Sequence, residues 1–209
     1  MVETWHDPDD VGICRLRAGG FHVVDVPRPR AVSDTAATNH GGIAAVAFTD
    51  AWLELIDIDA TPSMFEFACV RVSSGAVSYI VCAVYRPGSA TVSATFFVDL
   101  TDVLDRLATS VEPLFVVGDL NVHFERPADA SSVQLVDLLT APTHDLGGLL
   151  DIVASGDDLP PPSVEVVDVG LSDHRLVRWS VLTSRPPPDY TTSVVRPWRQ
   201  LECLMLLPS

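Results

Sequence analysis

The stretch that organises this chain is Phe115-Val116-Val117-Gly118-Asp119-Leu120-Asn121, in which an acid and an amide stand two residues apart after an apolar run. The run Leu114–Val117 has the length and composition of a buried strand, and Gly118 ends it. Residues that follow a strand end project from a rigid base, where active sites often form. Asp119 is therefore a candidate for orienting and deprotonating a water molecule, and Asn121 for donating a hydrogen bond to a phosphate oxygen. The alternative is an ordinary turn, since Gly, Asp and Asn all favour turns.

Short apolar segments separated by turn residues flank this stretch on both sides. Their patterns predict strands at Phe21–Val26, Ile43–Phe48, Phe65–Val72, Val77–Val84, Leu149–Val153, Val164–Val169 and Arg175–Val181, with a hairpin turn at Ser73-Ser74-Gly75-Ala76. Helical spacing of apolar residues predicts helices over Asp99–Thr109 and Ser131–Leu139, the second capped by Ser131 or Ser132. Strands with helices between some of them favour an α/β sandwich of two packed sheets with the helices outside.

Length and composition are those of one folded domain. The chain has 209 residues, of which 47% are hydrophobic and 20% charged, so a core is available and a disordered chain is excluded. From Pro186 the sequence becomes polar and proline-rich, which is typical of a linker. We therefore expect a domain over residues 1–182 and a linker with a short apolar tail over residues 183–209.

Cysteine usage, hydropathy and charge bear on location and partners. Scattered cysteines without a zinc-type pair indicate buried, inert thiols in a reducing intracellular compartment; they are Cys14, Cys69, Cys82 and Cys203. No apolar run approaches the roughly 20 residues that span a bilayer, and no signal peptide is visible, so no membrane partner is predicted. The net charge of −15 argues against tight, autonomous DNA binding. It does not exclude a nuclease, because metal-binding carboxylates add negative charge and the metal offsets it.

Two further segments place polar groups in or beside strands. Tyr85, in Tyr85-Arg86-Pro87-Gly88, directly follows an apolar strand and could set its hydroxyl on a phosphate; the alternative is an aromatic ring packed at the rim of a turn. Asp151 interrupts an apolar run, where a buried acid needs a partner, and His174 is the natural one. The alternative for Asp151 is the solvent face of an edge strand.

The two ends of the domain each hold one more candidate. Ser172-Asp173-His174 precedes a strand and could hold an imidazolium near a phosphate or contribute to a metal site, although such pairs also occur in surface turns. Glu3, in Glu3-Thr4-Trp5, could give a carboxylate to a hard cation such as Mg²⁺. A frayed terminus is the alternative for Glu3.

Taken in order, these segments resemble the endonuclease/exonuclease/phosphatase superfamily. The matching motifs are Glu-Thr-Trp, Tyr-Arg-Pro-Gly, Gly-Asp-Leu-Asn, Leu-Asp and Ser-Asp-His, supported by Asn39-His40-Gly41-Gly42 and Arg196-Pro197-Trp198. The likeness is greatest to the endonuclease domain of non-LTR (LINE-type) retrotransposon polyproteins, and it covers residues 2 to 182. It implies a DNase I-like fold. The family opens with a core strand that carries an asparagine, and no such strand precedes Met1, so the domain is expected to lack its first strand.

The resemblance also implies a role for each matching residue. Glu3 would ligate Mg²⁺, which Mn²⁺ could replace, and Asp173 would support the metal. Tyr85 would contact the phosphate, and Thr143 would match a substrate-binding threonine that precedes the Leu-Asp strand.

For the chemical step, the resemblance assigns Asp119 to activating or aligning the attacking water, with Asn121 beside it. His174, paired with Asp151, would stabilise the phosphate in the transition state. The implied reaction is in-line attack of water on a phosphodiester, and the implied partner is DNA, nicked in the nucleus at the first step of target-primed reverse transcription. Two alternatives stay open: an inactive, truncated remnant, and an enzyme of the same fold acting on a small phosphorylated substrate, which the acidic balance favours.

Overall fold

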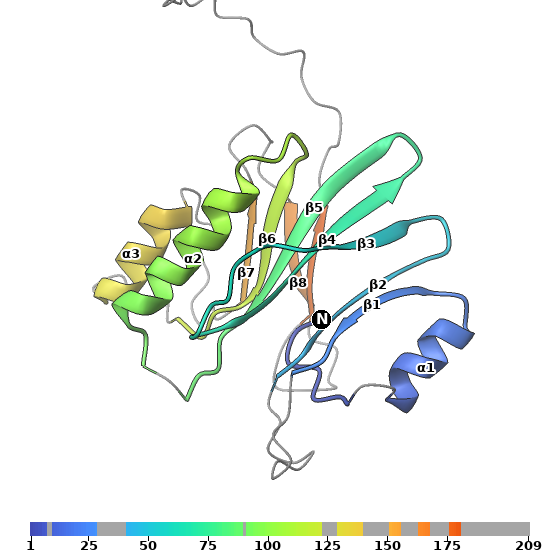
Figure 1. Cartoon of the computed structure of the whole chain (residues 1–209), viewed down its shortest axis with the longest axis horizontal. Helices are drawn as coiled ribbons and strands as arrows, with labels where there is room; N and C mark the ends of the chain where they lie inside the picture. The colour runs from blue at the N-terminus through green and yellow to red at the C-terminus, as the bar shows by residue number, and fades with distance from the viewer. Residues whose placement is uncertain are drawn as a thin grey trace, which may run out of the picture.

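The computed structural model describes residues 1–7, 10–28, 41–89, 91–122, 129–139, 151–155, 163–167 and 176–180 (Figure 1). The elements are α1 Val11–Ala18, β1 His22–Val26, β2 Ile43–Ala47, β3 Trp52–Ile56, β4 Glu66–Ser74, β5 Val77–Tyr85, α2 Ala94–Leu107, β6 Leu114–Asp119, α3 Ala130–Leu139, β7 Asp151–Ser155, β8 Ser163–Val167 and β9 Leu176–Ser180.

A five-stranded sheet in the order β3-β4-β5-β6-β7 forms the centre of the fold (Figure 1). Neighbouring strands are antiparallel except β5 and β6, which run parallel with Tyr85 opposite Asp119. A parallel pair needs a crossover connection, usually a helix, and α2 provides it. The carboxyl ends of β5 and β6 therefore lie side by side, and the residues that leave them are neighbours.

Helix α2 covers one face of this sheet and builds the main hydrophobic core with it. Its buried residues recur every three or four positions, which puts them on one side of the helix: Phe96, Leu100, Val103 and Leu107. The strands contribute buried residues to the same cluster: Cys69, Ile80, Cys82, Val84 and Val116. Each large side chain buried in this way contributes about 1.5–3 kcal/mol, so the layer holds β5 and β6 firmly in place.

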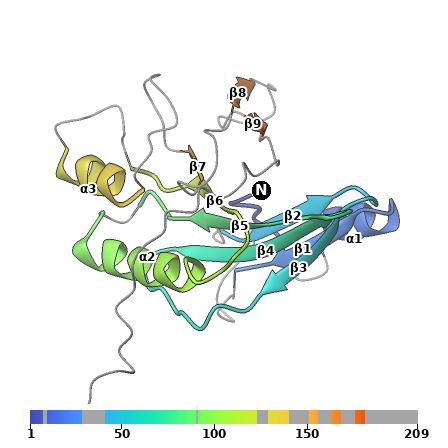
Figure 2. The ribbon, with the colours of Figure 1, turned by 90° about the horizontal axis from the view of Figure 1, so that it is seen from above.

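Two smaller antiparallel sheets, β1-β2 and β8-β9, account for the other described strands. Figure 2 shows β8 and β9 on the side of the five-stranded sheet opposite α2. The N-terminal residues join the first small sheet, because Val2 bridges Ile43 and the Met1 amine donates to the Ala44 carbonyl oxygen at 2.9 Å. Helix α2 on one face of the five-stranded sheet and the strands β8 and β9 on the other confirm the mixed α/β fold expected from the sequence.

The strands predicted from the sequence are confirmed to within two residues at each end. The hairpin between β4 and β5 is tighter than predicted, since Ser74 pairs with Val77 and the loop is Gly75-Ala76 alone. Gly75 has a φ of +59°, a backbone angle that glycine adopts without a steric penalty. Two elements were not predicted, α1 and the strand β3.

Other expectations need correction. β6 does not end at Gly118 but continues through it to Asp119, and the first predicted helix begins at Ala94 instead of Asp99. The Asp129 carboxylate accepts a hydrogen bond from the Ser131 amide at 3.0 Å, so an acid and not a serine caps α3.

Two cysteines lie in the core as expected, but Cys14 on α1 is exposed and Cys203 is outside the described residues. In the described part of the chain, none of the helices has the length and apolar character required to cross a membrane.

Candidate active site

The site begins where β6 passes close to β5. Gly118 has a φ of +136°, and a Cβ atom there would lie 1.9 Å from the Val84 carbonyl oxygen, so only glycine fits. The next residue, Asp119, stands opposite Tyr85 in the parallel ladder and is only 2% exposed. Paired residues on neighbouring strands share a face of the sheet, so these two side chains emerge together.

Asp119 and Asn121 form one hydrogen-bonded unit, a contact that the sequence analysis did not predict. The Asn121 amide nitrogen donates to Asp119 Oδ1 at 2.8 Å, and the Asn121 side-chain Nδ2 donates to Asp119 Oδ2 at 2.9 Å. Asn121 adopts a φ of +49°, which asparagine tolerates better than most residues. The segment does turn, but the turn directs an amide onto a buried carboxylate and so orients both carboxylate oxygens.

Arg86 holds this turn in place, a role that the sequence reasoning missed. Its side chain is buried, and its guanidinium donates to three backbone carbonyl oxygens. Nε donates to Leu120 at 2.6 Å and Nη2 to Asn121, both in the turn after β6, while Nη1 donates to Pro87 after β5 at 3.2 Å. The Arg86 carbonyl oxygen accepts from Asn121 Nδ2 at 2.7 Å. Burial lowers the pKa of Arg86, and the negative charge of Asp119 opposes that shift. The Tyr-Arg-Pro-Gly motif contained this residue, but its pattern did not indicate that the guanidinium faces inward.

Tyr85 and Glu3 meet at the same end of the sheet although 82 positions separate them in the sequence. The Tyr85 hydroxyl donates to Glu3 Oε1 at 2.8 Å, and Tyr85 is only 3% exposed. Burial, followed by the hydrogen bond to Glu3, raises the pKa of Tyr85 well above its usual value. The hydroxyl therefore keeps its proton near neutral pH and serves as a hydrogen-bond donor.

Glu3 is not at a frayed terminus, because its segment pairs with residues before β2. The Thr4 amide donates to the Gly42 carbonyl oxygen at 3.2 Å and the Trp5 amide to the Gly41 carbonyl oxygen at 2.9 Å. Glu3 itself has a φ of +54°, a conformation that costs energy for a residue with a side chain. The pairing on both sides holds the carboxylate at the strand ends in spite of that cost.

A buried polar pair that the sequence did not reveal joins the segment that carries Glu3 to β1. His6 Nε2 and Asp25 Oδ1 are in hydrogen-bond contact, and both side chains are almost fully buried. The Thr4 hydroxyl and His6 Nδ1 are buried, and neither forms a hydrogen bond to a described residue. This pair ties the N-terminal segment to β1 and so helps to fix where Glu3 sits.

The remaining predicted residues are described only in part. Asp151 is the first residue of β7 and pairs with Asp119 through the backbone ladder, so Tyr85, Asp119 and Asp151 occupy one level across three neighbouring strands. That backbone position is all that is described for Asp151. Thr143, Asp173 and His174 lie outside the described residues, and so does the predicted pairing of Asp151 with His174.

The metal prediction can be compared with the oxygen ligands present. Among the described residues, no three His, Cys, Asp or Glu side chains gather closely enough to share a metal ion. Closed sets of that kind are typical of zinc, whereas Mg²⁺ keeps several waters and takes one or two carboxylates. The half-buried Glu3 carboxylate beside the Tyr85 hydroxyl fits the second type of site.

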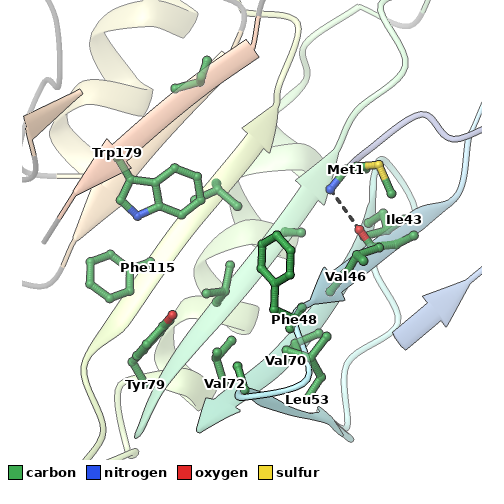
Figure 3. A pocket seen from close by; sticks show the side chains of 18 of the residues that line it. Met1, Ile43, Val46, Phe48, Leu53, Val70, Val72, Tyr79, Phe115 and Trp179 are labelled. Atoms are coloured by element: carbon green, nitrogen blue, oxygen red, sulfur yellow. Dashed lines mark hydrogen bonds between the residues drawn. The ribbon is translucent and has the colours of Figure 1, made fainter. Parts of the chain in front are cut away.

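A hollow lies between the sheets, and its lining differs in character from the polar site. It has a volume of about 600 Å³ and lies between β4–β6 on one side and β2 and β9 on the other. Figure 3 shows the rings of Phe48, Phe115 and Trp179 around it. Its lining is mostly apolar, and neither Tyr85 nor Asp119 belongs to it, so the hollow is separate from the polar site.

Comparisons with known proteins identify the fold. No protein-family model matches the sequence, and no curated protein matches it. Among solved structures, the chain is similar to the 3′ phosphatase NExo from Neisseria bound to a product DNA hairpin, with a TM-score of 0.55, 16% identity and coverage of 86% of each chain. It is also similar to the human Nocturnin catalytic domain with a bound sulfate anion, with a TM-score of 0.52, 16% identity, and coverage of 86% of this chain and 79% of that one. Both have the DNase I-like fold, and this chain shares that fold.

Proposed function

We propose that the chain is a metal-dependent phosphodiester hydrolase that nicks DNA, as a retrotransposon endonuclease does before target-primed reverse transcription. The observation that carries the proposal is the Tyr85–Glu3 hydrogen bond beside the Asp119–Asn121 pair. This arrangement sets a hydroxyl donor, two carboxylates and an amide at the adjoining ends of β5 and β6. The fold supports it, since one similar structure is a 3′ phosphatase with a bound DNA product.

Asp119 is proposed to align the attacking water and accept its proton. The two hydrogen bonds from Asn121 fix the carboxylate, so little reorganisation is needed when the water binds. The Tyr85 hydroxyl, which keeps its proton, would donate its hydrogen bond to a phosphate oxygen in place of Glu3.

Mg²⁺, or Mn²⁺ in its place, is proposed to bind at Glu3, with Asp173 as a supporting carboxylate. When bound, such an ion offsets negative charge that develops on the phosphate and the leaving group. His174, positioned by Asp151, is proposed to stabilise the same charge by hydrogen bonding, and Thr143 to contact the substrate.

Two alternatives remain as competing proposals. The chain could be an inactive remnant of such a domain, or it could hydrolyse a small phosphorylated substrate. The net charge of −15 favours the second over DNA, because a strongly acidic protein repels a polyanion. If the DNA-nicking proposal holds, the protein acts inside the cell, with the nucleus as the proposed site.

Conversion of supercoiled plasmid to the nicked form tests the proposal. Nicking is expected with Mg²⁺, and it should stop in excess EDTA and in the Asp119→Ala and His174→Ala variants. Asp105→Ala, which removes an exposed carboxylate from α2, is the matched control and should nick at the wild-type rate. Nicking that survives EDTA or both site substitutions contradicts the assignment. Inactivity on plasmid together with Mg²⁺-dependent release of phosphate from a small phosphate ester identifies the small-substrate alternative.

A further inference from the structure

The described part of the site holds two arginines with very different surroundings. The Arg86 guanidinium is buried and its donors are engaged by backbone carbonyl oxygens, which leaves it unsuited to a ligand. The Arg28 side chain follows β1 and is 28% exposed. Its Nε faces Glu66 Oε1, and neither terminal nitrogen forms a hydrogen bond to a described residue.

Glu66 ties Arg28 to the candidate active site. It is the first residue of β4 and stands directly opposite Tyr85 in the antiparallel ladder. Its second oxygen, Oε2, accepts a hydrogen bond from the Gly42 amide at 2.7 Å. Glu66 is therefore anchored through one carboxylate oxygen and holds Arg28 through the other.

The absence of a side chain at Gly41 leaves room for the ion pair between Arg28 and Glu66. A Cβ atom on Gly41 would lie 2.6 Å from Arg28 Nε and 2.5 Å from Glu66 Oε1, so a larger residue would displace the pair. The positive charge of Arg28 also acts on Tyr85, whose pKa it lowers against the larger upward effects of burial and Glu3. The guanidinium thus lies within electrostatic range of the Tyr85 hydroxyl.

We propose that Arg28, positioned by Glu66, forms an anion subsite that binds a phosphate of the nucleic-acid backbone next to the one cleaved at Tyr85 and Asp119. The inference rests on the proposed function, since it names a second contact of the same substrate. A guanidinium presents two parallel N–H donors that match two phosphate oxygens. Glu66 Oε1 lies on the Nε side of Arg28 as an ion-pair partner and accepts no hydrogen bond from a described residue, so Glu66 does not occupy the terminal nitrogens. In a chain with a net charge of −15, such a cation would let a polyanion approach the acidic strand ends.

Binding without turnover tests the subsite separately from catalysis. The full chain is titrated into a fluorescein-labelled duplex oligonucleotide with Ca²⁺ in place of Mg²⁺, and anisotropy is recorded at several salt concentrations. Arg28→Gln is expected to weaken binding about tenfold and to reduce the slope of log K against log salt by about one. Arg28→Lys keeps the charge but not the paired donors, so its affinity for the oligonucleotide should lie between those of the wild type and Arg28→Gln.

Two further variants separate a phosphate contact from a structural role. Arg15→Gln removes an exposed arginine of α1, a helix that contributes no side chain to the site described above, and should bind as the wild type does. Glu66→Gln should weaken binding less than Arg28→Gln, because the cation remains but is held less firmly. Thermal melting followed by circular dichroism identifies any variant that fails to fold. If Arg28→Gln fails to fold, the affinity of Arg28→Lys is compared with that of the wild type instead.

The outcomes are distinct. An Arg28→Gln variant with wild-type affinity and salt slope overturns the subsite, and so does a wild-type chain without salt-dependent binding. If binding depends on Arg28 while the wild type does not nick plasmid, the subsite stands and the proposed catalysis fails.

Discussion

Removing a single oxygen atom, in Tyr85→Phe, tests the site and its energetics together. The ring is 3% exposed and keeps its packing, while the 2.8 Å hydrogen bond to Glu3 Oε1 is lost. A hydrogen bond to a charged group contributes about 1.5–3 kcal/mol. Because Glu3 is only half-buried and water can replace part of the contact, we expect a loss of about 1–2 kcal/mol in the free energy of unfolding.

Tyr79→Phe is a matched control on the same strand. The Tyr79 ring packs edge-on against Phe115 with 5.7 Å between ring centroids, and its hydroxyl forms no hydrogen bond to a described residue. This substitution should change the free energy of unfolding by less than about 0.5 kcal/mol.

Urea denaturation followed by tryptophan fluorescence measures both variants. With an m-value of about 2 kcal/mol/M, the midpoint should fall by about 0.5–1 M in Tyr85→Phe. Nicking by the same variant should slow by about 100-fold or more, as when a donor to a developing oxyanion is removed. Equal midpoints in Tyr85→Phe and Tyr79→Phe would refute the energetic reasoning, and equal nicking rates would refute the phosphate contact.

The pH dependence of the same comparison follows from the raised pKa of Tyr85. Burial and the Glu3 hydrogen bond favour the protonated hydroxyl in the folded state, while the unfolded chain titrates near the ordinary value of 10.0. The stabilisation is therefore complete below pH 10 and is lost as the pH rises toward the folded-state pKa. The stability difference between wild type and Tyr85→Phe should shrink above pH 10 and stay constant between pH 7 and 9.

Two further predictions concern the framework of the site. Gly118→Ala should lower the free energy of unfolding by at least about 3 kcal/mol, because its Cβ would lie 1.9 Å from the Val84 carbonyl oxygen. Gly75→Ala, where a Cβ meets nothing within 4 Å, should cost only about 1 kcal/mol, and similar melting temperatures for the two variants would contradict this account. The hydrogen bond with Cys69, followed by burial, raises the pKa of the Cys82 thiol. A thiol reagent should therefore modify exposed Cys14 in the native protein and Cys82 only after unfolding. Peptide mapping that finds both thiols labelled at one rate would exclude a closed core.

The sequence predicted the central strands well because their apolar pattern and their packing agree. Val77–Val84 and Leu114–Val117 are apolar on both faces, and one face meets α2 while the other meets the smaller sheets. β3 was missed because Glu54 and the exposed Trp52 and Leu55 break the alternation that a half-buried strand should show. Only its pairing with β4 makes it a strand.

Within the site, the residues of a local motif were predictable and contacts between distant segments were not. Asp119 and Asn121 are two residues apart, so their hydrogen bonds depend on a local turn. The inward placement of Arg86 depends on carbonyl oxygens 34 and 35 residues away, and the His6–Asp25 pair on the course of the N-terminal segment past β2. Side-chain type alone does not indicate such partners.

Three site residues, Tyr85, Asp119 and Asp151, lie directly opposite one another on neighbouring strands. The site is therefore sensitive to insertions and deletions within those strands. Successive side chains on a strand point to opposite faces, so one residue inserted within β5 would move Tyr85 to the α2 face or force the pairing with β6 to slip. Gly118 resists such a slip, because no other residue could take its place against Val84. A homologue can therefore retain every motif and still have lost the site, whenever the number of residues between a strand's start and its last polar residue has changed by one.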